Sequence, residues 1–139
     1  MRKINKIIVH CSATPEGRNV LISEVKRWHV EERGWSDIGY HFVIELDGSV
    51  RIGRPIEIKG AHTRGHNFDS IGVAYIGGLD LDMKSKDTRT ECQKESLVNL
   101  LTELKDTYGG QVFGHRDFSD KDCPSFDARH QYENISFRY

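Results

Sequence analysis

The sequence predicts a single α/β domain in which a central mixed β-sheet is flanked by helices. Short apolar runs that end in turn residues alternate along the chain with segments of helical periodicity. The pair Asp47-Gly48 is a hairpin signal between two such runs, so at least one strand pair should be antiparallel. The length of 139 residues fits one domain, which we expect to span residues 1–139.

The N-terminal half should supply a strand, a helix and the hairpin. Residues 4–9 are apolar enough to be buried on both faces, which predicts a strand that ends at His10. Ser23 is a good N-cap, and apolar residues at helical spacing follow it until Gly34, where the helix should end. The two strands of the hairpin are expected at residues 40–46 and 50–53.

The C-terminal half should add two strands and two helices. A strand at 71–77 precedes a polar segment at 80–89, which we expect to be a mobile loop. The clearest periodicity lies in 91–108, where leucines form one helical stripe. The remaining elements are a short strand at 111–114 that leads into His115 and a final short helix, capped by Ser125, through Tyr132.

Composition excludes several classes of function. The chain has 20 basic and 21 acidic residues, so it lacks the excess of positive charge that nucleic-acid binders use, and we expect no nucleic-acid partner. An apolar run long enough to span a membrane is absent from the sequence. The apolar stretch Ile7-Ile8-Val9 is too short for a secretory signal, so we expect synthesis in the cytoplasm, as a monomer, without a signal peptide.

Three side chains that could bind a metal lie close to the ends of predicted strands. His10 ends one strand, His115 ends another, and Cys123 follows in the next loop. Sites form where strands of an open α/β sheet end, because side chains leave the packed layer there. Two imidazoles and a thiolate are a sound ligand set for Zn²⁺, and catalytic zinc sites usually combine three protein ligands with a water.

The spacing of these residues leaves other interpretations open, because it matches no compact zinc-finger pattern. The histidines could be core or surface residues and the cysteines buried thiols. A structural zinc site would have all four positions filled by protein. A third alternative is a nucleophilic Cys123 with His115 as its base, which would need a depressed thiol pKa.

Neighbouring residues in a strand point to opposite faces, and this limits which side chains can share a site. Only one of Tyr40 and His41 can readily reach it. If His10 points into the site, Cys11 points away and packs as a small core residue. Lys121 would lie close to a metal held by Cys123, where its ammonium could stabilise an oxyanion; otherwise it is a solvated loop lysine.

A series of motifs runs in order through nearly the whole chain, from about residue 4 to about residue 130. Together they resemble the N-acetylmuramoyl-L-alanine amidases, most closely the amidase-type lysozymes of bacteriophages, and more distantly the peptidoglycan recognition proteins of animals. The main motifs are Val9-His10-Cys11-Ser12-Ala13-Thr14, residues 33–44, residues 60–67, Gly114-His115-Arg116-Asp117 and residues 121–127.

The resemblance implies an activity and a site. The implied reaction is hydrolysis of the amide bond between N-acetylmuramic acid and L-alanine in peptidoglycan, on the cell wall after release from the cell. One Zn²⁺ per chain would be held at the positions that match the family's metal ligands, with a tyrosine and a lysine beside it. In this sequence the ligands map onto His10, His115 and Cys123, the tyrosine and lysine onto Tyr40 and Lys121, and a stretch of the substrate groove onto His62, Thr63 and Asn67.

The competing interpretation is a module that binds peptidoglycan without cutting it. Loss of the cysteine ligand would be its expected mark, and Cys123 is present. The residue that protonates the leaving amine is not assigned by the resemblance.

Overall fold

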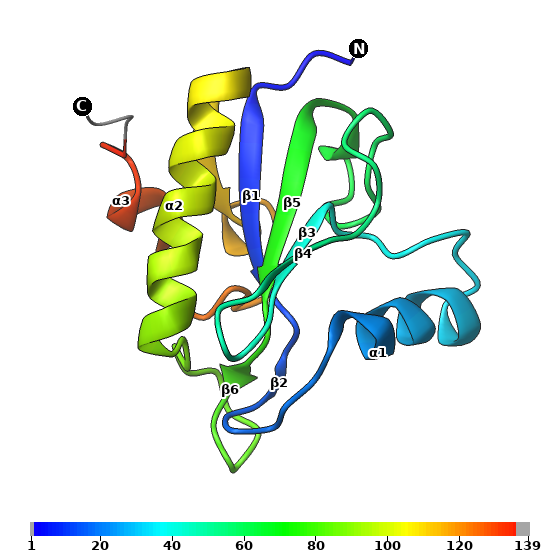
Figure 1. Ribbon diagram of the computed structural model, residues 1–139, viewed down its shortest axis with the longest axis vertical. Helices are drawn as coiled ribbons and strands as arrows, with labels where there is room; N and C mark the ends of the chain where they lie inside the picture. The colour runs from blue at the N-terminus through cyan, green and yellow to red at the C-terminus, as the bar shows by residue number, and fades with distance from the viewer. Residues whose placement is uncertain (1, 136–139) are drawn as a thin grey trace.

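A five-stranded mixed sheet with helices on both of its faces forms the protein, as seen in the computed structural model, which describes residues 2–135 (Figure 1). Strand β1 pairs in parallel with β5 and β7, β3 pairs in parallel with β5, and β4 pairs antiparallel with β3. The predicted α/β class is therefore confirmed. In the spatial order β4-β3-β5-β1-β7, the strands are Val50–Ile52, Phe42–Ile44, Ser70–Tyr75, Lys6–Cys11 and Gln111–Gly114.

Smaller elements surround this sheet. A two-stranded parallel ribbon pairs β2 (Thr14–Pro15) with β6 (Gly78–Leu79) beyond the carboxyl ends of β1 and β5. Three short helical segments and a last helix complete the described chain: η2 at Asn67–Asp69, η3 at His115–Asp117, the π-helical η1 at Trp28–Glu32 and α3 at Ala128–Gln131.

Helix α2 (Glu91–Tyr108) covers one face of the sheet, where the larger core lies (Figure 1). Alternate residues of β1 and β5 point to this face and contact the leucine stripe of the helix. Gln93 is fully buried in the first turn, and its Nε2 donates to the carbonyls of Ile44 and Ile76, which anchors the helix to two neighbouring strands. The main members of this core are Ile7, Val9, Cys11, Ile71, Val73, Tyr75, Leu97, Leu101 and Val112.

The opposite face of the sheet is covered by α1 (Ile22–Arg27) and by loops. A smaller cluster that includes Val25 of the helix and Val43 of β3 lies there. Because side chains alternate along β1, His10 points to this face while Val9 and Cys11 point to α2. The expectation that the side chains of His10 and Cys11 point to opposite faces is confirmed. A site that includes His10 therefore lies on the face away from α2.

The start of α1 differs from the prediction. Ser23 is not its N-cap: the helix begins at Ile22 after Leu21, whose side chain makes no capping hydrogen bond. Instead Glu45 Oε2 accepts from the backbone N–H of Ile22 at 2.9 Å. A carboxylate from a distant part of the chain therefore accepts a hydrogen bond from an otherwise unpaired N–H of the first turn. Its negative charge also interacts favourably with the positive end of the helix dipole.

Two further predictions needed correction. Strand β1 continues to Cys11, so His10 lies within the strand rather than at its end. Asp127, not Ser125, caps α3, because its side chain accepts from His130 N. At the end of the segment 80–89, which was expected to be a loop, Arg89 is buried, pairs with Asp87 and stacks on Phe126.

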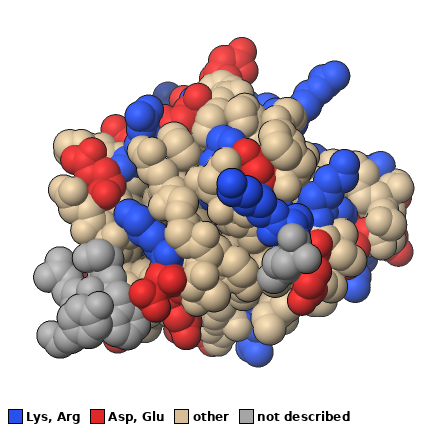
Figure 2. Space-filling view, turned by 90° about the horizontal axis from the view of Figure 1, so that it is seen from above, with Lys and Arg blue, Asp and Glu red and all other residues tan. Residues whose placement is uncertain are grey.

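The surface matches the balanced composition. Figure 2 shows basic and acidic side chains interspersed with uncharged ones on the face seen from above. Within residues 2–135, none of the helices combines the length and the apolar character that crossing a membrane requires.

The N-terminus of α2 provides a test of this fold. Thr90 caps the helix, because its Oγ1 accepts from Gln93 N at 3.1 Å while Gln93 Oε1 accepts from Thr90 N at 3.0 Å. We expect Thr90→Ala to lower the free energy of unfolding by about 1 kcal/mol, measured by urea denaturation. Thr107→Ala, at an exposed position of the same helix, is the matched control and should leave stability unchanged or raise it slightly, because alanine is the better helix former.

Candidate functional site

The pairing of β1 with β7 brings His10 and His115 together. Val9 lies opposite Gly114 in this parallel pair, so the next residue along each strand direction is one of the two histidines. Their ring centroids are 4.6 Å apart. Parallel strands end at the same edge of a sheet, which explains how residues so distant in sequence meet.

A loop that follows η3 carries Cys123 to the same place. The backbone N–H of Arg116 donates to the Cys123 carbonyl at 2.7 Å, which ties this loop to the residue after His115. The hydroxyl of Tyr75, buried at the end of β5, donates to the Pro124 carbonyl at 2.6 Å. The N–H of Cys11 points at Cys123 Sγ, 3.2 Å away, so the backbone fixes the sulfur atom as well as the loop.

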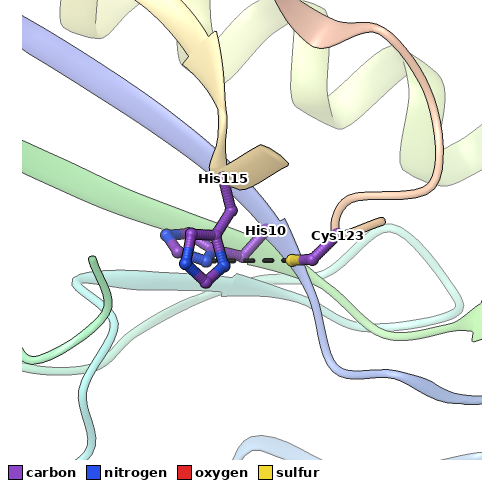
Figure 3. Close-up of side chains that lie close together, drawn as sticks. All are labelled: His10, His115 and Cys123. Atoms are coloured by element: carbon purple, nitrogen blue, oxygen red, sulfur yellow. Dashed lines mark hydrogen bonds between the residues drawn. The ribbon is translucent and has the colours of Figure 1, made fainter. Parts of the chain in front are cut away.

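The three side chains lie close enough together to hold a metal ion (Figure 3). One ligand atom from each lies within 4.8 Å of the others, and His10 Nδ1 is 3.9 Å from Cys123 Sγ. Zn–N and Zn–S bond lengths in a tetrahedral site place neighbouring ligand atoms roughly 3.5 Å apart, so a small inward movement would suffice. The two imidazoles and the thiol therefore fit Zn²⁺. Among residues 2–135, they form the one group of three or more possible metal ligands.

The surroundings keep both histidines in the form that binds metals. Burial lowers the pKa of His10 well below its ordinary value, and the neighbouring His62 and His115 lower it further. Burial also lowers the pKa of His115, with a smaller contribution from the Lys121 charge. Neutral imidazoles offer a lone pair at pH 7, so a cation would not have to displace a proton from either ring.

The surroundings of Cys123 keep its side chain in the protonated thiol form. A hydrogen bond with the Cys11 thiol and burial both raise the pKa of the Cys123 thiol. A cysteine nucleophile needs a depressed pKa, so these surroundings disfavour that alternative. A bound cation would instead stabilise the thiolate directly, which favours a ligand role for Cys123.

Tyr40, and not His41, lies beside the candidate ligands. Its ring centroid is 5.1 Å from that of His10, whereas His41 Nδ1 accepts a hydrogen bond from Gly72 N. Burial raises the pKa of the Tyr40 phenol above its ordinary value, so this hydroxyl stays protonated and can donate a hydrogen bond.

No role at the site was predicted for His29, which lies beside Tyr40 in the wall of the cavity around these residues. It lies in the π-helical turn η1, with its ring 5.4 Å from that of Tyr40, and its Nδ1 accepts from Gly39 N at 2.9 Å. One signal was available: His29 follows the buried Val25 by one helical turn and therefore faces the sheet.

A cavity of about 450 Å³ contains the three ligands and opens on the face away from α2. The residues expected to bind substrate lie in its wall: His62 and Thr63 on the loop before η2, and Asn67 at the first position of η2. Asn67 Oδ1 accepts from both His62 N and Thr63 N at 2.9 Å, so the side chain of Asn67 shapes this loop. Lys121 is exposed at the wall, and the charged residues that line the cavity are all basic: Arg33, Arg64 and Lys121.

Known proteins share this fold and sequence. The family model for N-acetylmuramoyl-L-alanine amidase matches residues 1–126. The endolysin of Klebsiella phage KP32 is 41% identical over 133 residues, which cover 95% of this chain and 87% of that protein. The solved N-acetylmuramoyl-L-alanine amidase LysC from Clostridium intestinale superposes with a TM-score of 0.78 at 28% identity, covering 94% of this chain and 82% of that one.

An animal protein has the same architecture. The bumblebee peptidoglycan recognition protein SA superposes with a TM-score of 0.78 at 26% identity, over 99% of this chain and 86% of that chain. The expected kinship with the recognition proteins is therefore confirmed at the level of fold.

The burial of His29 predicts a pH dependence of stability. Burial, with Arg33 and Arg54, lowers its pKa from 6.5 to about 4, so between these values the unfolded chain binds more protons than the folded one. The contribution of His29 to the free energy of unfolding is therefore fully present above about pH 6.5. It decreases toward pH 4, by up to about 3 kcal/mol. In urea unfolding at pH 7 and pH 4, His29→Asn should show a smaller loss than the parent chain.

His130→Asn is the matched control, because His130 is exposed on α3. Its loss of stability between the two pH values should equal that of the parent chain. An equal loss in His29→Asn would contradict the assigned burial effect.

Proposed function

Because this chain belongs to the N-acetylmuramoyl-L-alanine amidase family, we propose that it cuts the amide bond between N-acetylmuramic acid and L-alanine in peptidoglycan, with one Zn²⁺ held by His10, His115 and Cys123. Cell-wall hydrolysis by an amidase is the activity that this membership gives; the metal and the residue roles are our proposal. The observation that supports it most is the convergence of three ligand atoms in an open cavity.

The donor set suits the proposed ion and reaction. Zinc, when bound, would supply Lewis-acid polarisation of the amide carbonyl and a water of lowered pKa. The chain holds neutral imidazoles and a backbone-anchored sulfur ready for it. Three protein ligands leave room for a reacting group, as in catalytic rather than structural zinc sites.

Two side chains are proposed to act on the substrate. The protonated hydroxyl of Tyr40, beside His10, would orient the attacking water through a hydrogen bond. Lys121 would stabilise the negative charge that develops on the carbonyl oxygen as the amide is attacked. The charge of Lys121 is close enough to His115 to lower its pKa, which supports a place near the reacting bond.

The cavity wall is proposed to select the substrate. A muropeptide bears carboxylates on its stem, and the charged lining residues Arg33 and Arg64 have the complementary sign. Asn67 uses Oδ1 to hold its own loop, so its amide NH₂ is the group that we propose for substrate contact, with Thr63 and His62 behind it. The proposed partner is therefore peptidoglycan, bound by a monomer at the cell wall.

A non-catalytic peptidoglycan-binding module is the alternative function. Its mark would be an incomplete ligand set, and here Cys123 lies in place with both histidines. We therefore favour hydrolysis.

Digestion of purified sacculi tests the proposal directly. We expect the protein to release stem peptides that begin with L-alanine, identified by mass spectrometry, and we expect phenanthroline to abolish this release. Cys123→Ser should stay folded but lose most bound zinc and most activity, whereas Cys92→Ser, at an exposed position on α2, should retain both. Full activity of metal-free Cys123→Ser would overturn the proposal.

Lys121→Ala tests the oxyanion role. Loss of one charge that stabilises the transition state should lower kcat roughly a hundredfold or more, with zinc content unchanged, measured on a soluble muropeptide. Lys59→Ala removes an exposed lysine outside the cavity lining and should have no effect on kcat. An unchanged rate in Lys121→Ala would make this residue an ordinary surface lysine.

A further inference from the structure

The two ring nitrogens of His10 face different partners. Nδ1 is the atom nearest Cys123 Sγ, at 3.9 Å, and therefore faces the candidate metal position. Nε2 points away from it and lies 2.9 Å from His62 Nδ1, with Thr63 Oγ1 farther away at 3.3 Å. The shorter of these contacts joins His10 to a residue that the ligand set does not include.

Metal binding through Nδ1 determines where the protons lie. A neutral imidazole that offers Nδ1 to a cation carries its proton on Nε2. That Nε2–H then donates to His62 Nδ1, which leaves the proton of His62 on its own Nε2. Ser70 Oγ lies 3.3 Å from His62 Nε2 and accepts the hydrogen bond from its N–H. One assignment of protons thus satisfies the chain His10–His62–Ser70.

The ring of His62 occupies a slot that two glycines create. A Cβ added to Gly72, on β5, would lie 2.6 Å from ring atoms of His62, and one added to Gly60 would also lie 2.6 Å from the ring. Such distances exclude any side chain at either position while the ring stays in place. The backbone therefore holds the orientation of His62, and His62 in turn can hold that of His10.

We propose that His62 is a positioning residue, which accepts the Nε2–H of His10 and so fixes the ring and the tautomer that present Nδ1 to zinc. This inference rests on the proposed function and deepens it, because it gives His62 a role behind the metal rather than only in the substrate groove. Groups that hydrogen-bond to a metal-bound histidine typically raise metal affinity 10–100-fold. Thr63 Oγ1, at 3.3 Å, is the weaker acceptor.

Zinc affinity, measured by competition with a chromogenic chelator, tests the inference without relying on activity. His62→Leu removes the acceptor with little change of volume and should weaken zinc binding roughly 10–100-fold. His62→Asn places an oxygen near the position of Nδ1 and should restore affinity to within a few-fold of the parent chain. Thr63→Val keeps the shape of the side chain but removes a hydroxyl that lies 3.0 Å from His62 Nδ1 and 3.3 Å from His10 Nε2, and it should weaken zinc binding less than His62→Leu does.

Two further measurements separate positioning from folding. The unfolding midpoint of the zinc-free chain should be similar in His62→Leu and His62→Asn, since a purely structural role would move this midpoint and leave affinity alone. In the zinc-loaded parent chain, ¹⁵N NMR of the imidazoles should find His10 bound through Nδ1 and protonated at Nε2. This second result does not depend on any variant folding.

Parental affinity in folded His62→Leu, or binding of zinc through His10 Nε2, would overturn the inference. So would a Thr63→Val variant that loses affinity while His62→Leu does not. The proposed function has its own separate failure, which is a parent chain that does not bind zinc at all. In that case the His62 variants would have no affinity to compare.

Discussion

The parallel pairing of β1 with β7 sets the position of everything at the site. It fixes Val9 opposite Gly114, and the residues that follow are His10 and His115. A shift of one residue in this register would turn the side chains of one strand to the other face, because side chains alternate with a period of two. Hydrophobic contacts of Ile7 and Val9 with α2 stabilise this register. The packing of the sheet face that meets α2 therefore determines the geometry of the opposite face.

Burial then gives the site its chemistry. An imidazole inside the protein is costly to charge, and His10 and His115 therefore stay neutral and available as ligands. A buried polar group also needs hydrogen-bond partners, which the fold provides through His62 and Ser70 on one side and the N–H of Cys11 on the other. The hydrogen bonds that make burial tolerable are the ones that we propose to orient the ligands.

The sequence predicted what local patterns determine. Helix α2 and strand β7 have the bounds expected, because a leucine stripe and the Gly109-Gly110 pair are local signals. Ser23 failed as a cap because Glu45, remote in sequence, supplies the acceptor to Ile22 N. Strand ends suggested His10, His115 and Cys123 as ligands, but only the resemblance to amidases chose zinc over a nucleophilic cysteine. The contacts of His29 and of His62 join distant segments, which no single-sequence pattern describes.

The division of the sheet into two faces has a practical consequence for engineering heat tolerance. The larger core lies between the sheet and α2, whereas His10 and Tyr40 lie on the reverse side; of the three candidate ligands, Cys123 packs against that core. Better packing or better helix formers on the outer surface of α2 would raise the melting temperature without altering a cavity wall. The usual conflict between rigidity and turnover is therefore weakened here, since the solvent-facing side of α2 is remote from the residues that line the cavity.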